Sequence, residues 1–298
     1  MKCDRCENTA AYTRRYSGES LCGECFSASI VRKTARTISR HNMIRRGDDV
    51  AVAVSGGKDS LSLLHVLHQL SGRGGYSIRA VTVDEGIPGY RDEALEIAQG
   101  YCSSLGVEYS MTSYEELYGA TLEETLGRTE GGSCSVCGVL RRRAIDHLAR
   151  GADVVATAHN MDDHIQTFLI NLMSGDTSKI GRNASPKRIK PFCRIYESEI
   201  VFYAFINGIP FQTEPCPHAD EGMRTDIRRF LNEMEERRSG IKNGMYRSIE
   251  RISECVPDAK TLAPCGRCGE PATGGVCSVC RTLDAAELPA PYTGGGPA

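Results

Sequence analysis

The sequence contains no tryptophan, and aromatic residues make up only 6% of its 298 residues. It also lacks any apolar run of the roughly 20 residues that a membrane-spanning helix needs, and its polar start, Met-Lys-Cys-Asp, does not resemble a signal peptide. The net charge is only -2, so overall charge does not indicate a nucleic-acid partner. These absences predict a cytoplasmic protein that is not inserted in a membrane, with one α/β core and small appendages.

Cysteine, in contrast, is abundant, with 14 residues that lie mostly in Cys-x-x-Cys pairs. Disulfide frameworks are typical of short secreted chains, whereas such pairs in a longer chain favour metal sites in a reducing compartment. At each end of the chain, two such pairs have the spacing of a four-thiolate zinc site. A redox dithiol is an alternative for the N-terminal group. The predicted zinc ligands are Cys3, Cys6, Cys22 and Cys25 at one end and Cys265, Cys268, Cys277 and Cys280 at the other.

Residues 50–60 combine an unbroken run of valine and alanine with the turn Ser-Gly-Gly-Lys-Asp-Ser. The run predicts a buried parallel strand, and the apolar spacing that follows predicts that the turn opens a helix. Glycines let a bulky anion approach the backbone, while the helix N-terminus and a lysine add positive charge. The turn differs from the pattern G-x-x-x-x-G-K-[ST]. We predict a phosphate-binding loop rather than a turn that binds nothing, formed by Ser55, Gly56, Gly57, Lys58, Asp59 and Ser60.

Strand and helix patterns alternate along the middle of the chain. We expect strands at residues 77–85, 107–112, 153–158 and 209–213, helices at 91–105, 199–207 and 224–252, and a basic loop at 179–194. This alternation predicts an α/β fold with a doubly wound, mostly parallel sheet whose ligand binds at the carboxyl ends of the strands. In that arrangement the backbone of Val83 lies beside the phosphate loop, where it can pair with an adenine edge.

Polar residues also follow the predicted strand at 153–158. Asp162 and Asp163 would face the same crevice as the phosphate loop, where carboxylates commonly bind Mg²⁺. The alternative for either aspartate is to cap the following helix. His159, at the strand end, is predicted to contact a phosphate or to orient the substrate.

A third cysteine group stands apart from the terminal pairs. Cys134 and Cys137 open a predicted helix that continues with three adjacent arginines, which would stabilise thiolates, and the further sulfur is Cys216, between two prolines. Three thiolates are too few for a closed zinc site but suit a cluster or metal with one open position. Persulfide or disulfide chemistry is the alternative. The remaining cysteines, Cys102, Cys193 and Cys255, are expected to be small apolar fillers.

Residues 29–46 contain no acidic residue, and Arg32, Arg36 and Arg40 recur at every fourth position. On a helix these arginines form one stripe, which is either a solvated face or a contact for a phosphate backbone. The predicted order of units is an N-terminal zinc ribbon (1–28), a basic linker helix (29–46), the core (47–218), a helical extension (219–260), a C-terminal zinc ribbon (261–283) and a disordered tail (284–298).

The Ser-Gly-Gly-Lys-Asp-Ser turn is similar to the PP-loop of the ATP pyrophosphatase superfamily, whose members activate a carbonyl oxygen by adenylation. With its terminal ribbons, the Cys134-x-x-Cys137 pair and the later Cys216, the chain resembles the TtuA and NcsA group of tRNA 2-thiouridine synthetases over residues 3–280. The resemblance implies that residues 55–60 bind ATP, that Cys134, Cys137 and Cys216 hold a [4Fe-4S] cluster, and that each ribbon binds one Zn²⁺.

The same resemblance implies a tRNA uridine 2-sulfurtransferase that adenylates the C2 oxygen and replaces it with sulfur, releasing AMP and pyrophosphate. Its implied partners are tRNA, a ubiquitin-like sulfur carrier with a C-terminal thiocarboxylate, and a second copy of the chain. TtuA-type sequences carry a lysine where this chain has Arg141, a residue we assign to the cofactor site. This difference favours the anticodon wobble uridine. The alternatives are T-loop thiolation, a PP-loop ligase with a nitrogen nucleophile, and a non-catalytic zinc-ribbon RNA-binding protein.

Overall fold

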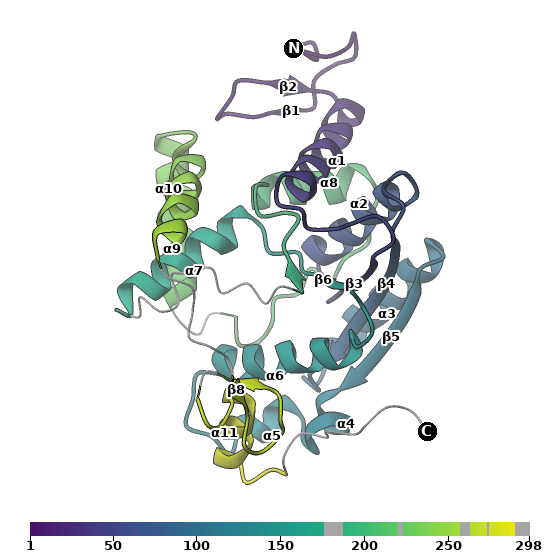
Figure 1. Cartoon of the computed structure of the whole chain (residues 1–298). Helices are drawn as coiled ribbons and strands as arrows, with labels where there is room; N and C mark the ends of the chain where they lie inside the picture. Colours follow the sequence, from purple (N-terminus) through teal and green to yellow (C-terminus); the bar gives the residue numbers. More distant parts are fainter. Residues whose placement is uncertain (176–186, 220–222, 257–262, 273, 290–298) are drawn as a thin grey trace.

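A computed structural model of the chain describes residues 1–175, 187–219, 223–256, 263–272 and 274–289. At its centre lies a sheet of five parallel strands in the order β5-β4-β3-β6-β7 (Figure 1). These strands are β3 (Asp49–Ala53), β4 (Ser77–Asp84), β5 (Glu108–Ser113), β6 (Val154–Ala156) and β7 (Arg188–Ile189). The chain adds β4 and β5 on one side of β3, then β6 and β7 on the other. The predicted doubly wound parallel sheet is confirmed, and its order reverses between β3 and β6.

Helices cover both faces of this sheet. Three of them lie on one side, α2 (Lys58–Gly74), α3 (Arg91–Ser104) and α8 (Glu197–Ile206), while α6 (Ser133–Leu148) packs on the other. Successive side chains of a strand point to opposite faces, so Val50 and Val52 join the first layer and Ala51 clusters with Ala149 and Ala152 beyond the end of α6. Because both faces are buried, the β3 sequence is apolar throughout rather than alternating.

A group of three helices stands beside the sheet (Figure 1). It consists of α7 (Met161–Met173), α9 (Met223–Arg237) and α10 (Ile241–Cys255), and α7 packs against both of the others. The stretch 224–252, predicted as one helical segment, is therefore two helices. Gly240, with a φ of 93°, adopts the left-handed conformation that turns the chain between them.

Two predictions for the last strand were wrong. Residues 209–213 form no strand, because the Gln212 N–H donates to the Gly56 carbonyl (3.0 Å) in the loop after β3 instead of to a neighbouring strand. The fifth strand is β7, inside the stretch 179–194 that was predicted to be a loop, of which residues 179–186 lie outside the described residues. With only two residues, β7 is too short to show a strand pattern.

The two cysteine ribbons lie at opposite ends of the molecule (Figure 1). The first pairs β1 (Tyr12–Thr13) with β2 (Ser20–Leu21) and continues into α1 (Gly23–Arg40); the second pairs β8 (Ala263–Pro264) with β9 (Pro271–Ala272) and continues into α11 (Ser278–Ala285). The second ribbon packs in one cluster with α6 and the short helices α4 (Tyr114–Tyr118) and α5 (Leu122–Leu126). The expected pair of ribbons is thus present as two folded units.

The N-terminal ribbon is held to the core by ion pairs around Glu199 in α8, a residue whose side chain is 0% exposed. Its carboxylate contacts the Arg14 guanidinium (2.5 Å) and the Lys33 amine (3.0 Å). Both cations outweigh burial and lower the pKa of Glu199, so the carboxylate stays charged. We call these residues the Glu199 ion cluster.

The ordered C-terminal unit extends further than the boundary expected at residue 284. Helix α11 ends at Ala285, and Ala286 and Leu288 are buried against the ribbon. The rest of the expected tail, from residue 290, lies outside the described residues. Within the described part of the chain, no helix has the length and apolar character needed to cross a membrane.

Candidate active site

The loop after β3 is shaped by its glycines. Gly56 has a φ of 82°, and a Cβ added there would lie 2.3 Å from the Ala94 carbonyl oxygen of α3. Gly57 is the N-cap of α2 and has no side chain to block the helix N-terminus. Ser60 fixes the turn, because its hydroxyl accepts from the Ser55 N–H (3.0 Å) and donates to the Gly57 carbonyl (3.0 Å). The loop is thus a rigid, open end of α2 where the helix dipole favours an anion.

Lys58 lies between two carboxylates, Asp59 (2.7 Å) and Glu197 (3.0 Å). Burial alone would lower the pKa of Lys58, but these carboxylates outweigh it and raise the pKa. For Asp59 burial dominates and raises the pKa, although Lys58 opposes it. Glu197 begins α8 and was not predicted. It lies 139 positions from Lys58, and its sequence surroundings contain no motif that marks it.

The two predicted magnesium ligands have other partners. Asp162 is 5% exposed, pairs with the Lys242 amine of α10, and accepts from the Glu197 N–H (2.9 Å). Asp163 forms a capping box with Asn160 at the start of α7, with both hydrogen bonds at 3.0 Å. Burial, then the charges of Asp59 and Glu197, raise the pKa of Asp163. Asp163 therefore caps its helix and also faces the phosphate loop, whereas Asp162 is committed to Lys242.

Two other predicted residues also lie at this edge of the sheet. Val83 is 4% exposed, and its carbonyl accepts from Arg91 (2.7 Å). The His159 Nδ1 contacts the Thr157 hydroxyl (3.0 Å), and His159 is an exposed residue. Partial burial, followed by nearby cations of which Lys190 acts most strongly, lowers the pKa of His159 to about 4. The imidazole is therefore neutral near pH 7.

The third cysteine group is assembled from two segments. Cys134 is exposed at the start of α6, while Cys137 is 8% exposed and shares a cluster with Cys216. The Cys134 thiol contacts the His218 carbonyl (3.6 Å), so the loop that carries Cys216 meets the helix N-terminus. Burial raises the pKa of Cys137.

The three cysteines of this group are spaced differently from those of the ribbons. Among the described residues, the sulfurs of the group do not gather within 4.8 Å of one another as those of the ribbons do. In a four-iron cluster each cysteine binds a different iron, so its ligands stand further apart than those of one zinc ion. One thiol is exposed, one is buried and the third is on a loop that meets the helix start, so the three do not form a compact site for one ion.

Two of the three adjacent arginines of α6, Arg141 and Arg143, have separate partners. Arg141 donates to the Cys137 sulfur (3.0 Å) and pairs with Glu85 (2.6 Å). Arg143 points to the C-terminal ribbon, where it donates to the sulfurs of Cys268 (3.7 Å) and Cys277 (3.8 Å). The expectation that all three stabilise the thiolates at the helix start was therefore wrong, since consecutive helix positions face different directions.

Both ribbons have the chemistry of a metal site. The four sulfurs of each lie within 4.8 Å of one another. Cys22 and Cys277 cap α1 and α11, each accepting from a backbone N–H of its own helix. Backbone N–H groups, above all those of Cys22 and Cys268, lower the pKa of Cys3 and of Cys265 to about 6. Four cysteine sulfurs gathered in this way are the ligand set of a structural zinc ion.

The cysteines outside these groups differ in burial. Cys102 is 0% exposed and Cys193 is 4% exposed, whereas Cys255 is exposed at the end of α10. An apolar filler role therefore fits the first two but not Cys255.

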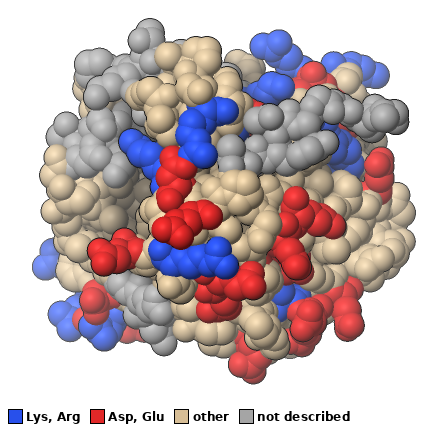
Figure 2. Space-filling model, turned by 90° about the horizontal axis from the view of Figure 1, so that it is seen from below, with Lys and Arg blue, Asp and Glu red and all other residues tan. Residues whose placement is uncertain are grey.

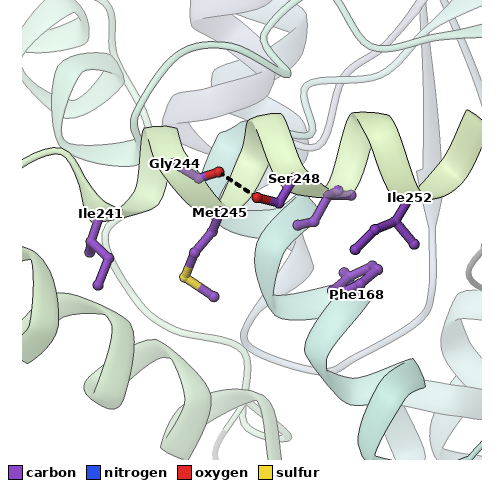
Figure 3. A pocket seen from close by; sticks show the side chains of 7 residues that line it. Phe168, Ile241, Gly244, Met245, Ser248 and Ile252 are labelled. Carbon is purple, nitrogen blue, oxygen red and sulfur yellow. Dashed lines mark hydrogen bonds between the residues drawn. The ribbon is translucent and has the colours of Figure 1, made fainter.

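A pocket of about 370 Å³ lies between α7 and α10 (Figure 3). Its lining is almost wholly apolar, and the one hydroxyl, of Ser248, donates to the Gly244 carbonyl (3.1 Å). Phe168 and Ile252 close one end. The lining offers no titratable side chain, so this pocket cannot hold phosphates and is separate from the candidate active site.

Surface charge is uneven. Figure 2 shows groups of acidic side chains on the face seen from below. Between residues 92 and 130 the only exposed cation is Arg128, whereas the exposed acids are Asp92, Glu93, Glu96, Glu108, Glu115, Glu116, Glu123, Glu124 and Glu130. Cations gather instead around His159, where Lys190, Arg224, Arg142 and Arg188 act on its ring. A polyanion would be repelled by the first surface and attracted to the second.

Comparisons with known proteins agree with this geometry. A family model described as the PP-loop domain matches residues 28–235, and one described as the N-terminal LIM domain of the 2-thiouridine synthetase TtuA matches residues 2–27. The cytoplasmic tRNA 2-thiolation protein 1 of Drosophila melanogaster is 37% identical over 310 residues, which cover 98% of this chain and 90% of the relative. The protein of the same name in Mus musculus is 35% identical over 302 residues, which cover 95% of this chain and 72% of the relative.

A solved structure is also similar, that of the U34-tRNA thiolase NcsA from Methanococcus maripaludis with its [4Fe-4S] cluster. It has a TM-score of 0.86 and 30% sequence identity, and the match covers 95% of this chain and 96% of that chain. The chain therefore belongs to the PP-loop family of tRNA 2-thiolation proteins.

Proposed function

We propose that this protein is an ATP-dependent enzyme that converts a tRNA uridine, at the anticodon wobble position, into 2-thiouridine. One observation carries the proposal. The segment that leads to Cys216 is hydrogen-bonded to the phosphate loop, through the Gln212 N–H and the Gly56 carbonyl (3.0 Å). This contact supports one shared site for sulfur chemistry and nucleotide chemistry, at the reversal of strand order where α/β folds bind ligands.

The first half of the reaction is activation of the base. The phosphates of ATP would lie on residues 55–60, with Lys58 turning from its carboxylates to the phosphate oxygens. Asp59, Asp163 and Glu197 are the carboxylates that could hold Mg²⁺, and Asp162 would act indirectly, by fixing Lys242 and the Glu197 backbone. The uridine C2 oxygen attacks the α-phosphorus and pyrophosphate leaves. Lys58 and the α2 N-terminus stabilise the charge that develops on the phosphates.

The second half is replacement of the activated oxygen by sulfur. A [4Fe-4S] cluster on Cys134, Cys137 and Cys216 would supply one iron without a protein ligand, as a place to hold sulfur. The exposed Cys134 leaves this site open to a sulfur donor, for which a ubiquitin-like carrier with a C-terminal thiocarboxylate is the proposed partner. Sulfur forms a bond to C2 and AMP departs with the oxygen. A persulfide on the same cysteines is the alternative route.

The charged surfaces suggest how tRNA approaches. The cations act on His159, which follows β6 directly at the carboxyl edge of the sheet, and Arg32, Arg36 and Arg40 form an exposed stripe on α1. We propose that the neutral His159 orients the target nucleotide, that Zn²⁺ in each ribbon holds the flanking units in shape, and that a homodimer is the working form. The wobble position is supported by the name of the NcsA neighbour and by Arg141, and a cytoplasmic location by the names of the relatives.

The proposal is tested by thiolation assays under anaerobic conditions with ATP, sulfide and tRNA transcripts. Transcripts with cytidine at the wobble position should lose product, whereas a substituted T-loop uridine should not matter. Lys58→Ala should abolish both AMP and 2-thiouridine formation, with the exposed Lys2→Ala as the matched control. Product that maps to the T-loop would overturn the wobble assignment. AMP formation that depends on an amine instead of sulfur would identify a ligase with a nitrogen nucleophile.

A further inference from the structure

A buried carboxylate that no part of the proposed mechanism uses lies between the two halves of the site. Glu85 follows β4 directly and is 3% exposed. One of its oxygens contacts the Arg91 Nε (2.6 Å) and the other contacts the Arg141 Nε (2.6 Å). A buried charge is retained in a fold only when partners compensate it, and here one carboxylate compensates two guanidinium groups.

The Arg91 arm of this network reaches the nucleotide side. Arg91 is 5% exposed and donates through Nη1 to the Ser55 carbonyl (2.9 Å) and through Nη2 to the Val83 carbonyl (2.7 Å). These carbonyls follow β3 and end β4, the neighbouring strands beside the phosphate loop. Arg91 therefore holds the first residue of the loop against β4, and the charge of Glu85 compensates its buried guanidinium through an ion pair that is not a directed hydrogen bond.

The Arg141 arm reaches the sulfur side. Its Nη2 donates to the Cys137 sulfur (3.0 Å), and Cys137 lies one helical turn earlier in α6. The Nε of the same guanidinium is held by Glu85. Because a guanidinium is planar, its contact with Glu85 sets the direction of the Nη2 hydrogen bond to sulfur.

We propose that Glu85 is a positioning residue that fixes the nucleotide loop relative to the Cys137 sulfur, acting through Arg91 on one side and Arg141 on the other. This inference rests on the proposed function. It adds the requirement that one buried carboxylate keeps the activated base and the sulfur at a fixed position relative to each other. Hydrogen bonds to the sulfurs of a cluster tune its electronic properties, and their loss typically lowers activity by about 10- to 100-fold.

The test compares Glu85→Gln with Glu199→Gln. Both replace a buried carboxylate between two cations by an amide of the same shape, but the Glu199 ion cluster joins the N-terminal ribbon to α8. Three quantities are measured on anaerobically prepared protein: the Kd of ATP, the rate of 2-thiouridine formation, and the electron paramagnetic resonance spectrum of the reduced cluster.

Glu85→Gln should weaken ATP binding, slow thiolation by about 10- to 100-fold, and change the resonance spectrum. Glu199→Gln should lower the temperature of unfolding while leaving the spectrum and the Kd at wild-type values. If Glu85→Gln shows the wild-type resonance spectrum, and if its thiolation rate equals that of Glu199→Gln, Glu85 is only structural and the inference fails. If the wild-type protein itself forms no cluster and no 2-thiouridine, the proposed function fails instead.

Discussion

Gly56→Ala is the substitution for which the structure predicts the most specific loss. At φ 82° an alanine adopts a left-handed conformation that costs about 1–2 kcal/mol. Its Cβ would lie 2.3 Å from the Ala94 carbonyl oxygen, a backbone atom of α3 that cannot rotate away. Overpacking of this kind costs about 1–3 kcal/mol, and the stiffer unfolded chain returns about 0.4–1 kcal/mol. We expect a net loss of about 1–5 kcal/mol from these terms together.

The adjacent Gly57→Ala is the matched control. Gly57 has an ordinary φ of -87°, and the nearest atom to its added Cβ is the Ser55 hydroxyl oxygen at 3.5 Å. Since 1 kcal/mol corresponds to about 2–4 °C for a core of this size, Gly56→Ala should melt at least about 2 °C below Gly57→Ala. Thermal unfolding followed by circular dichroism measures the difference. Equal melting temperatures would refute the view that Gly56 is required by the close approach of α3.

Three further predictions concern the surroundings of the site. Lys242→Met leaves Asp162 as a buried carboxylate without its cation and should lower the free energy of unfolding, measured with urea, by about 3–5 kcal/mol. Adding Asp162→Asn to the same chain should restore part of this loss. A Lys242→Met variant as stable as the wild type would contradict the buried ion pair. Removal of zinc by a strong chelator should accelerate hydrogen exchange in both ribbons while α2 stays protected, and unchanged exchange would argue against metal sites there. Neutralising Arg32, Arg36 and Arg40 to glutamine should reduce the salt dependence of tRNA binding by about one unit of log-log slope per arginine that contacts phosphate; an unchanged slope would mean that the stripe is only solvated.

The parts of the fold that could be predicted from the sequence are those encoded by neighbouring residues. The β3 run, the glycine turn and the helix after it form one continuous pattern, and so do the Cys-x-x-Cys pairs of the ribbons. The two residues of β7 and the loop after Ile209 were mispredicted, because a strand this short has no period and because Gln212 finds its acceptor in the phosphate loop. Whether segments as short as these form a strand depends on tertiary contacts.

The candidate site divides in the same way. Lys58, Cys134 and Cys137 stand in recognisable local patterns, whereas Glu197, which binds Lys58, is 139 positions away. The partner of Asp162 is Lys242, 80 positions further along the chain. Pairings across such separations are set by the packing of α8 and α10 and leave no mark on the local sequence, so a single sequence cannot reveal them.

Helix α6 connects sites that are otherwise far apart. Arg141 donates a hydrogen bond to the Cys137 sulfur, and Arg143 donates to a sulfur of the C-terminal ribbon. Between them, the backbone carbonyl of Arg142 accepts from the Arg188 side chain (2.7 Å). Consecutive residues are rotated by about 100° around a helix, so these directions are locked to one another. Deletion of a single residue between Cys137 and Arg141 would change the angle between Cys137 and the side chains of both Arg141 and Arg143, so their contacts could not all be kept. This stretch of the chain should therefore tolerate no change of length, whereas replacement of Arg143 alone would leave the contacts of Arg141 in place.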